Sequence, residues 1–302
     1  MFKSFKKIEG ECIVHKFLRS IGFSDIRKKD LEMILNDIIE CPDVLKVTKD
    51  SEGNEFAELS FEVAHNMGIK VCGSYEEDDH FHMDYYYPYL IGSTVTSQEQ
   101  IEVQKHAEKE SYAGVCDEVS LGVTLIFYIQ NVADFLAEKR MHETCIIQGA
   151  KMAALSTEGK ILLPVEKKKK DDQDRAYKQT ARNQLISQAR EGDEDAIESL
   201  TLEDMDTYSM ISRRVQHEDI LTIVTSYFMP YGIESDQYSI LGEIVDFYTT
   251  ENQVTEELIY CMKVECNDIM FDVCINAKDL LGEPAIGRRF KGNIWMQGEL
   301  CL

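Results

Sequence analysis

The chain has 302 residues, which is long for a single domain and comfortable for two. Its 55 acidic residues outnumber 32 basic ones, and the resulting net charge of -23 argues against general nucleic-acid binding because a phosphate backbone would be repelled. The nine cysteines are odd in number and include no CxxC pair, so they predict free thiols in a reducing cytoplasm. No apolar stretch is long enough to cross a bilayer, so we expect no membrane segment.

The N-terminal residues 1–13 carry no useful periodicity, and the chain becomes orderly only at Val14. The codons for Glu9-Gly10-Glu11 can contain a purine-rich ribosome-binding sequence, and Val14 could be a GTG start just downstream. Two alternatives therefore stay open for residues 1–13, a flexible tail or an extension upstream of the natural start.

Residues 14–165 are predicted to form an α+β domain, in which N-terminal helices pack against an antiparallel sheet. A short helical pattern over residues 15–21 ends at Gly22. A second run of apolar residues at helical spacing over residues 31–39 ends at Pro42. These two runs are the expected helices of the domain.

Strand patterns replace helical ones from Val44 to Pro164, where β-branched and aromatic residues are interrupted by turn residues. The last two segments, Cys145–Leu155 and Lys160–Val165, flank the turn-forming pair Glu158-Gly159. We expect them to form a β-hairpin.

Residues 166–206 are predicted to be a charged linker that contains a helix. The run KKKKDDQDR at 167–175 is a break in composition that is typical of a solvated linker or a helix start. Residues 176–200 then follow a helical pattern, and residues 191–206 contain eight acids and no base. A capped, solvated helix explains these acids, and a docking face for a basic partner is the alternative.

Residues 207–302 are predicted to be a β-rich, barrel-like domain of five strands. The candidate strands are separated by turn residues and are Ile220–Met229, Tyr238–Thr249, Glu257–Glu265, Ile269–Asn276 and Phe290–Leu300. So many strands in so short a segment favour a small barrel or a twisted sheet.

The chain contains no specific catalytic motif. It has no GxxxxGKS/T phosphate loop, no GxGxxG, no HExxH, no GxSxG and no EF-hand loop, and it indicates no cofactor. Whether the protein is an enzyme stays open, because Ser, His and Asp that meet only in space leave no local pattern.

Two clusters of histidine and carboxylate residues are candidate metal ligands. In extended segments, His80 and His82 project from one strand face, and His106, Glu108 and Glu110 share a face in the same way. Imidazole and carboxylate together suit zinc, iron or manganese. The alternatives are a solvated acidic loop for the first cluster and an exposed polar strand face for the second.

Two arginine doublets, Arg213-Arg214 and Arg288-Arg289, are candidates for an anion site. A guanidinium can fork onto a phosphate or a carboxylate, and Gly287 suggests a turn whose backbone N–H groups could help to hold the anion. Salt bridges to the many acids of the chain are the alternative.

The tyrosine-rich run Tyr85–Tyr89 predicts either a stacking platform for a ligand or a half-buried edge strand marked by Pro88. Cys261, Cys266 and Cys274 fall in expected strands, and we interpret them as buried structural thiols.

Four segments carry a resemblance to a known family: HKFLRSIGFS at 15–24, EGDEDAIESLTLEDMDTYSMISRR at 191–214, FMPYG at 228–232 and GEPAIGRRFKG at 282–292. They are similar to a family from clostridial bacteria that is a domain of unknown function, and the resemblance spans about residues 14–300. It implies a bacterial cytoplasmic protein and supplies no catalytic residues. Members of the family begin near His15, so residues 1–13 depart from its pattern.

Two functions from different classes stay open. The favoured one is a non-enzymatic cytoplasmic binding or scaffold protein, whose partner would be another copy of the chain, a basic protein, or a small anion at the arginine-bearing barrel. The alternative is a metal-dependent, hydrolytic enzyme that uses His80, His82, His106, Glu108 or Glu110.

Overall fold

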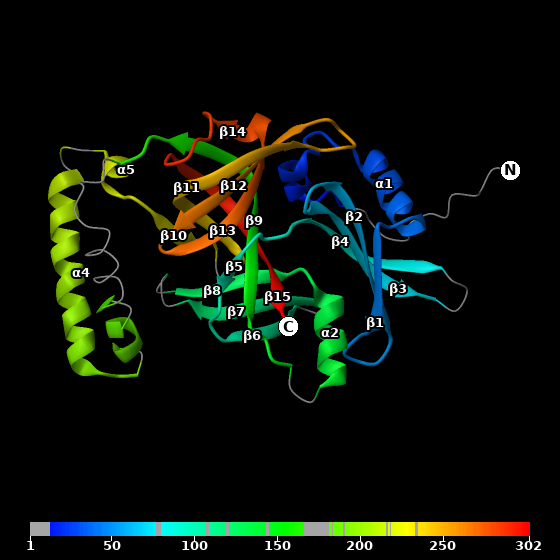
Figure 1. Cartoon of the computed structure of the whole chain (residues 1–302), viewed down its shortest axis with the longest axis horizontal. Coiled ribbons are helices and arrows are strands. Elements are labelled where there is room, and N and C mark those ends of the chain that lie inside the picture. The colour runs from blue at the N-terminus through cyan, green and yellow to red at the C-terminus, as the bar shows by residue number, and fades with distance from the viewer. Residues whose placement is uncertain are drawn as a thin grey trace.

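The computed structural model describes residues 13–76, 80–106, 109–118, 121, 123–142, 145–165, 181, 182, 184–189, 191–215, 217, 219–232 and 235–302. Of the predicted tail or upstream extension at residues 1–13, residues 1–12 lie outside these described residues, and so does the charged run at 167–175. The described chain forms two β-sheets, with helices around them (Figure 1).

The helical elements are η1 (Lys16–Ile21), α1 (Lys28–Glu40), α2 (Val132–Met141), α4 (Glu194–Val215), α5 (Ile220–Ile223) and η2 (Ala277–Asp279). The strands are β1 (Val44–Lys49), β2 (Glu55–Ala64), β3 (Met67–Tyr75), β4 (Phe81–Leu90), β5 (Val95–Ser97), β6 (Ile101–His106), β7 (Ser111–Glu118), β8 (Val123–Ile129), β9 (Gly149–Leu162), β10 (Tyr227–Pro230), β11 (Gln237–Glu251), β12 (Leu258–Cys266), β13 (Ile269–Asn276), β14 (Leu280–Leu281) and β15 (Arg289–Cys301).

The small sheet is a four-stranded antiparallel meander in the order β1-β2-β3-β4. Helix α1 buries Leu31, Leu35 and Ile38, which recur three and four residues apart and so share one helical face. Strand β4 is an edge strand, which tolerates Pro88 because proline has no N–H to donate to a neighbour. Helices packed with an antiparallel sheet confirm the α+β prediction for this part of the chain.

The large sheet contains a closed five-stranded barrel. The pairings run β11-β12-β13-β9-β15 and return from β15 to β11, so the circle is complete, with β13 and β9 as its parallel pair. Strand β15 then leaves the barrel and pairs with β8, which continues the sheet through β7 to β6. The C-terminal half of the chain is barrel-like as predicted, but the barrel takes one strand from before residue 165.

The predicted hairpin at residues 145–165 is wrong, because β9 runs unbroken through Glu158 and Gly159. Gly159 serves close packing here. A Cβ atom at this position would lie 2.5 Å from the ring of Phe290 on β15, so only glycine lets the two strands pair at this point. A single long strand is what allows β9 to span the barrel and to pair with β13 and β15 at once.

The first C-terminal strand, predicted as Ile220–Met229, is also wrong over its first half. Residues Ile220–Ile223 form α5, because the Asp219 carboxylate accepts a hydrogen bond from the backbone N–H of Leu221 and caps the turn. Only Tyr227–Pro230 is strand, and β10 pairs with β11 outside the closed barrel.

Helix α4 begins as the acidic composition predicts. The Asp193 carboxylate accepts hydrogen bonds from the N–H groups of Asp195 and Ala196, and Gly192 with a φ of 92° separates α4 from the helical residues 184–189. The helix continues past residue 206 to Val215 and lies beside the barrel, away from the small sheet (Figure 1). The division into 14–165, 166–206 and 207–302 stays a prediction.

The buried apolar side chains of both sheets belong to one continuous cluster, from Phe17 in η1 to Leu300 in β15. The buried thiols of Cys261, Cys266 and Cys274 are part of it, which confirms their structural interpretation. Within the described part of the chain, no helix is long and apolar enough to cross a membrane.

Candidate functional site

An aromatic pocket lies at the junction of the two sheets. It has a volume of about 300 Å³ and is lined by His15, Tyr85, Tyr86, Tyr87, His106, Lys109, Ser111, Tyr128 and Trp295. The three consecutive tyrosines come from the edge strand β4, and the remaining residues come from the segment before η1 and from β6, the turn after it, β7, β8 and β15. The pocket therefore exists only when both sheets are in place.

The rings of the aromatic pocket touch one another and form a continuous wall. The ring centroids of Tyr87 and Tyr128 are 4.8 Å apart, those of Tyr128 and Trp295 are 5.4 Å apart, and those of Trp295 and His15 are 5.0 Å apart. Tyr85 lies parallel to Tyr87 at 6.2 Å. Edge and tilted contacts of this kind hold each ring in place and leave aromatic surface for a ligand.

The polar atoms of these rings are held by the protein. Tyr85 donates to the Glu110 carbonyl at 2.5 Å, Tyr87 donates to the Gln130 carbonyl at 3.0 Å, and the Trp295 indole N–H donates to Asp236 at 2.6 Å. Burial raises the pKa of the Tyr85 and Tyr87 hydroxyls, so both stay neutral. The pocket wall is consequently rigid and apolar.

His15 is the exception among these residues. Its Nδ1 atom is buried and has no hydrogen-bond partner among the described residues. Among these residues, Ser20 Oγ is the other buried side-chain atom without a partner, and Ser20 lines neither the aromatic pocket nor the pocket around Arg288 and Arg289. Burial, together with the positive charge of Lys16, lowers the pKa of His15 to about 4, so the imidazole is neutral at pH 7. A neutral imidazole has one donor and one acceptor nitrogen, and the buried Nδ1 of His15 uses neither capacity.

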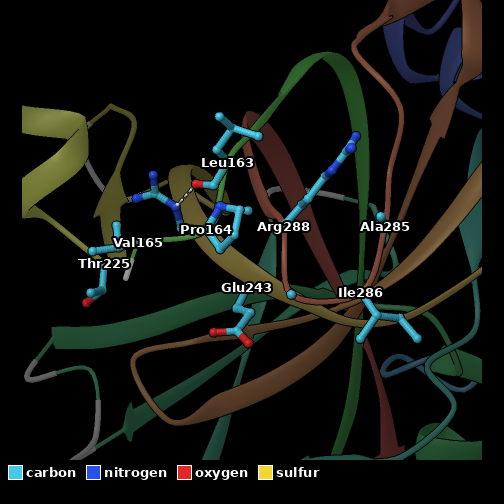
Figure 2. A pocket seen from close by; sticks show the side chains of 10 residues that line it. Leu163, Pro164, Val165, Thr225, Glu243, Ala285, Ile286 and Arg288 are labelled. Carbon is cyan, nitrogen blue, oxygen red and sulfur yellow. Dashed lines mark hydrogen bonds between the residues drawn. The ribbon is translucent and has the colours of Figure 1, made fainter. Parts of the chain in front are cut away.

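A second pocket, the arginine pocket, contains one of the predicted arginine doublets. It has a volume of about 540 Å³ and is lined by Leu163, Pro164, Val165, Thr225, Glu243, Ala285, Ile286, Gly287, Arg288 and Arg289 (Figure 2). Val165 is the last described residue before 166–180, so this pocket borders on a part of the chain that is not described.

The guanidinium of Arg289 is buried and is already bound on three sides. It donates to the backbone carbonyls of Leu163, Leu221 and Val224 at 2.8–3.0 Å, and burial lowers its pKa. Arg288 donates to the Glu283 carbonyl at 2.7 Å, and its side chain points away from Glu243 (Figure 2). Arg289, at the start of β15, thus holds the residue after β9 and the α5 turn together.

The backbone N–H groups at Gly287 and Arg288 are also hydrogen-bonded within the protein. The N–H of Gly287 donates to Ile244, and the N–H of Arg288 donates to Ala285. Arg213 and Arg214 lie on α4 and are not among the residues that line the arginine pocket. An anion site at these four arginines stays a prediction.

The candidate metal ligands are distributed over several elements. His80 lies just before β4, and His82 is on β4 with its Nε2 3.9 Å from Asp84, but neither lines the aromatic pocket. His106 lines the pocket, and Glu108 lies outside the described residues. Among the described residues, no three His, Cys, Asp or Glu side chains are placed to hold one metal ion.

Glu110 has a structural role. Its carboxylate accepts hydrogen bonds from Lys105, from Tyr112 at 2.5 Å and from Ser51 at 2.7 Å. Burial alone would raise the pKa of Glu110, but these hydrogen bonds outweigh burial and keep the pKa below its usual value. This network fixes the turn that carries Lys109 beside Tyr85.

Sequence reasoning finds part of the aromatic pocket. The run Tyr85–Tyr89 is predicted both as a stacking platform and as an edge strand, and His106 is predicted as a metal ligand. His15, Tyr128 and Trp295 carry no local pattern that points to a site, because they come from three elements far apart in sequence.

Comparison with known proteins identifies the family. A family model described as a domain of unknown function, named from an E. rectale gene (DUF3881), matches residues 18–298. The chain belongs to this family. The DUF3881 match confirms the predicted resemblance to a clostridial domain of unknown function and includes every residue of the aromatic pocket except His15. No curated protein and no solved structure matches the chain.

Proposed function

We propose that this DUF3881 protein is a non-enzymatic, cytoplasmic binding protein whose aromatic pocket takes a small planar ligand. The observation that carries the proposal is the set of contacting aromatic rings, with His15 among them, around a space of about 300 Å³. Pockets for small organic ligands are concave and mostly aromatic or apolar, with a few polar groups that set orientation.

The flat aromatic rings that line the pocket favour a planar ligand. The tyrosine hydroxyls and the indole N–H are bonded to the protein, so what the wall offers is aromatic surface, and stacking on such surface contributes about 1–3 kcal/mol for each ring. Leaving the buried Nδ1 of His15 unpaired costs about 1–3 kcal/mol of stability.

Protein partners and a homo-oligomer remain separate predictions that the pocket does not need. Helix α4 carries acids on a largely exposed surface, which suits a basic partner, and Arg288 offers an exposed charge beside the barrel. The small-ligand proposal is favoured over these because a set of contacting aromatic side chains around one pocket supports it.

The test uses the single tryptophan of the chain, which lies in the aromatic pocket. Its indole N–H gives one resonance in protein labelled with ¹⁵N at tryptophan, so the spectrum reports on this site alone. Naphthalene-2-carboxamide should shift the resonance saturably, and the saturated decahydronaphthalene-2-carboxamide, which has the same skeleton without a planar ring, should not.

Two variants complete the test. Tyr128→Leu removes one wall ring and should weaken binding of the planar amide about tenfold, because one stacking contact is lost. Tyr248→Leu removes an exposed tyrosine of β11 outside the pocket and should leave binding unchanged. Equal binding of the planar and saturated amides would overturn the proposed function, and so would the failure of every planar naphthalene probe to bind.

A further inference from the structure

The aromatic pocket is lined by basic and neutral residues, whereas the chain as a whole is strongly acidic. The whole chain has a net charge of -23, yet the lining residues include Lys109, His106 and His15 and no aspartate or glutamate. In a protein with so many acids, a pocket lined only by basic and neutral side chains attracts a negative ligand more strongly than the rest of the surface does.

Lys109 is the group that supplies this charge. Its ammonium donates to the backbone carbonyl of Asp84 at 2.7 Å, and it forms no ion pair with a described residue. Lys105, four residues earlier on the same hairpin, is paired with the Glu110 carboxylate. The charge of Lys105 is therefore neutralised inside the protein, and the charge of Lys109 is left to the pocket.

The carboxylate next to the pocket is already engaged. Asp236 accepts the Trp295 indole N–H at 2.6 Å, and it is attracted to His106 and Lys16. Burial raises the pKa of Asp236, although the hydrogen bond from Trp295 and the attraction to His106 and Lys16 oppose this rise. Asp236 orients Trp295 from outside the pocket and is not a lining residue that would repel an anion.

We infer that the ligand of the aromatic pocket is a planar aromatic carboxylate, with its ring against the tyrosines and Trp295 and its acid group at Lys109. This inference rests on the proposed function and names the class of ligand. One ammonium balances one negative charge, so a monoanionic carboxylate matches the charge of Lys109 better than a phosphate dianion does. A cationic ligand, which an aromatic cage alone would accept, is disfavoured by Lys109.

The experiment compares four probes of the same ring system on the full chain, by calorimetry and by the Trp295 indole resonance. They are naphthalene-2-carboxylate, the neutral naphthalene-2-carboxamide, 2-naphthyl phosphate and 2-naphthyltrimethylammonium. The carboxylate should bind about tenfold more tightly than the amide, because an ion pair with the Lys109 ammonium replaces a hydrogen bond from that ammonium to an uncharged carbonyl. The phosphate and the quaternary ammonium should both bind more weakly than the carboxylate.

Matched variants assign the preference to one side chain. Lys109→Gln keeps a donor for the Asp84 carbonyl and removes the charge, so it should bring the carboxylate to within about twofold of the amide and leave amide binding unchanged. Lys49→Gln makes the same change on exposed β1, outside the pocket, and should retain the tenfold preference.

The outcomes separate the inference from the function on which it rests. If the amide and the carboxylate bind equally, or if the phosphate or the ammonium binds best, the carboxylate inference is overturned and the proposed function stands. If no planar probe shifts the Trp295 resonance, the proposed function fails and the inference fails with it.

Discussion

The arginine pocket and the aromatic pocket both border on the barrel, but they use their polar groups differently. In the larger arginine pocket, the guanidinium of Arg289 is bound by three backbone carbonyls. In the smaller aromatic pocket, His15 has a buried nitrogen without a partner, and Lys109 carries a charge without a carboxylate. Its larger volume and its arginines favour the arginine pocket as a ligand site. The unpaired nitrogen of His15 and the charge of Lys109 favour the aromatic pocket.

The comparison teaches that a buried charged or polar group is evidence for a ligand site only when some of its donors or acceptors have no partner within the protein. The Arg289 guanidinium donates to the carbonyl of Leu163, just after β9, and to that of Leu221 in α5, so these donors already have partners within the protein. A native protein retains an unsatisfied buried group such as His15 Nδ1 at a cost in stability, which is common at functional sites.

The largest expected effect comes from Arg289. Arg289→Leu leaves the carbonyls of Leu163, Leu221 and Val224 unpaired, and we expect it to lower the free energy of unfolding by about 4 kcal/mol. Arg288→Leu, the matched control at the adjacent position, should change it by less than about 0.5 kcal/mol. Urea denaturation measures both. A loss below about 1 kcal/mol for Arg289→Leu would mean that this guanidinium is not structural, which would break the comparison.

The second effect is a pH dependence at His15. Its pKa is about 4 in the folded chain and 6.5 without the fold, because burial and Lys16 disfavour the charged form. Between these values the unfolded chain binds more protons, so this contribution to stability is complete above pH 6.5 and is lost as the pH falls toward 4. At about 1.4 kcal/mol for each pKa unit, the loss is about 3 kcal/mol.

The measurement is urea denaturation of the wild type and of His15→Phe from pH 7 to pH 4. Carboxylates such as Asp236 titrate in both proteins, so the difference between the two curves isolates His15. The wild type should lose stability faster than the variant. Parallel curves would show that the imidazole titrates normally and is not held neutral in the aromatic pocket.

At neutral pH the same substitution should stabilise the protein. His15→Phe keeps a ring against Trp295 and removes the unpaired nitrogen, so we expect a gain of about 1 kcal/mol in the free energy of unfolding. His106→Phe, an exposed histidine of the same pocket, should change it by less than about 0.5 kcal/mol. A destabilised His15→Phe variant would indicate that His15 contributes to the fold and not to a ligand site.

The sequence predicts individual helices and strands well, but it predicts poorly which distant strands pair with one another. Strand β13 has the predicted bounds Ile269–Asn276, because its apolar residues are dense and Asn267-Asp268 mark its turn. The hairpin at Gly159 is wrong because glycine serves both turns and close packing, and only the ring of Phe290 shows which applies. The same limit applies to the site, since the tyrosines of β4 are conspicuous but their partners lie on other strands.

The smallest effect concerns how the N-terminal segment closes the aromatic pocket. The Tyr86 hydroxyl donates to the Ile13 carbonyl at 2.5 Å and accepts the N–H of His15 at 2.9 Å, so it fixes the backbone next to the imidazole. Tyr86 is only half-buried, and Tyr86→Phe should cost about 0.5 kcal/mol of stability. The loosened segment should move Trp295 emission to longer wavelength, because His15 no longer shields the indole from water. An unchanged emission would mean that His15 is positioned by η1 alone, and that the aromatic pocket is complete without the Tyr86 contact.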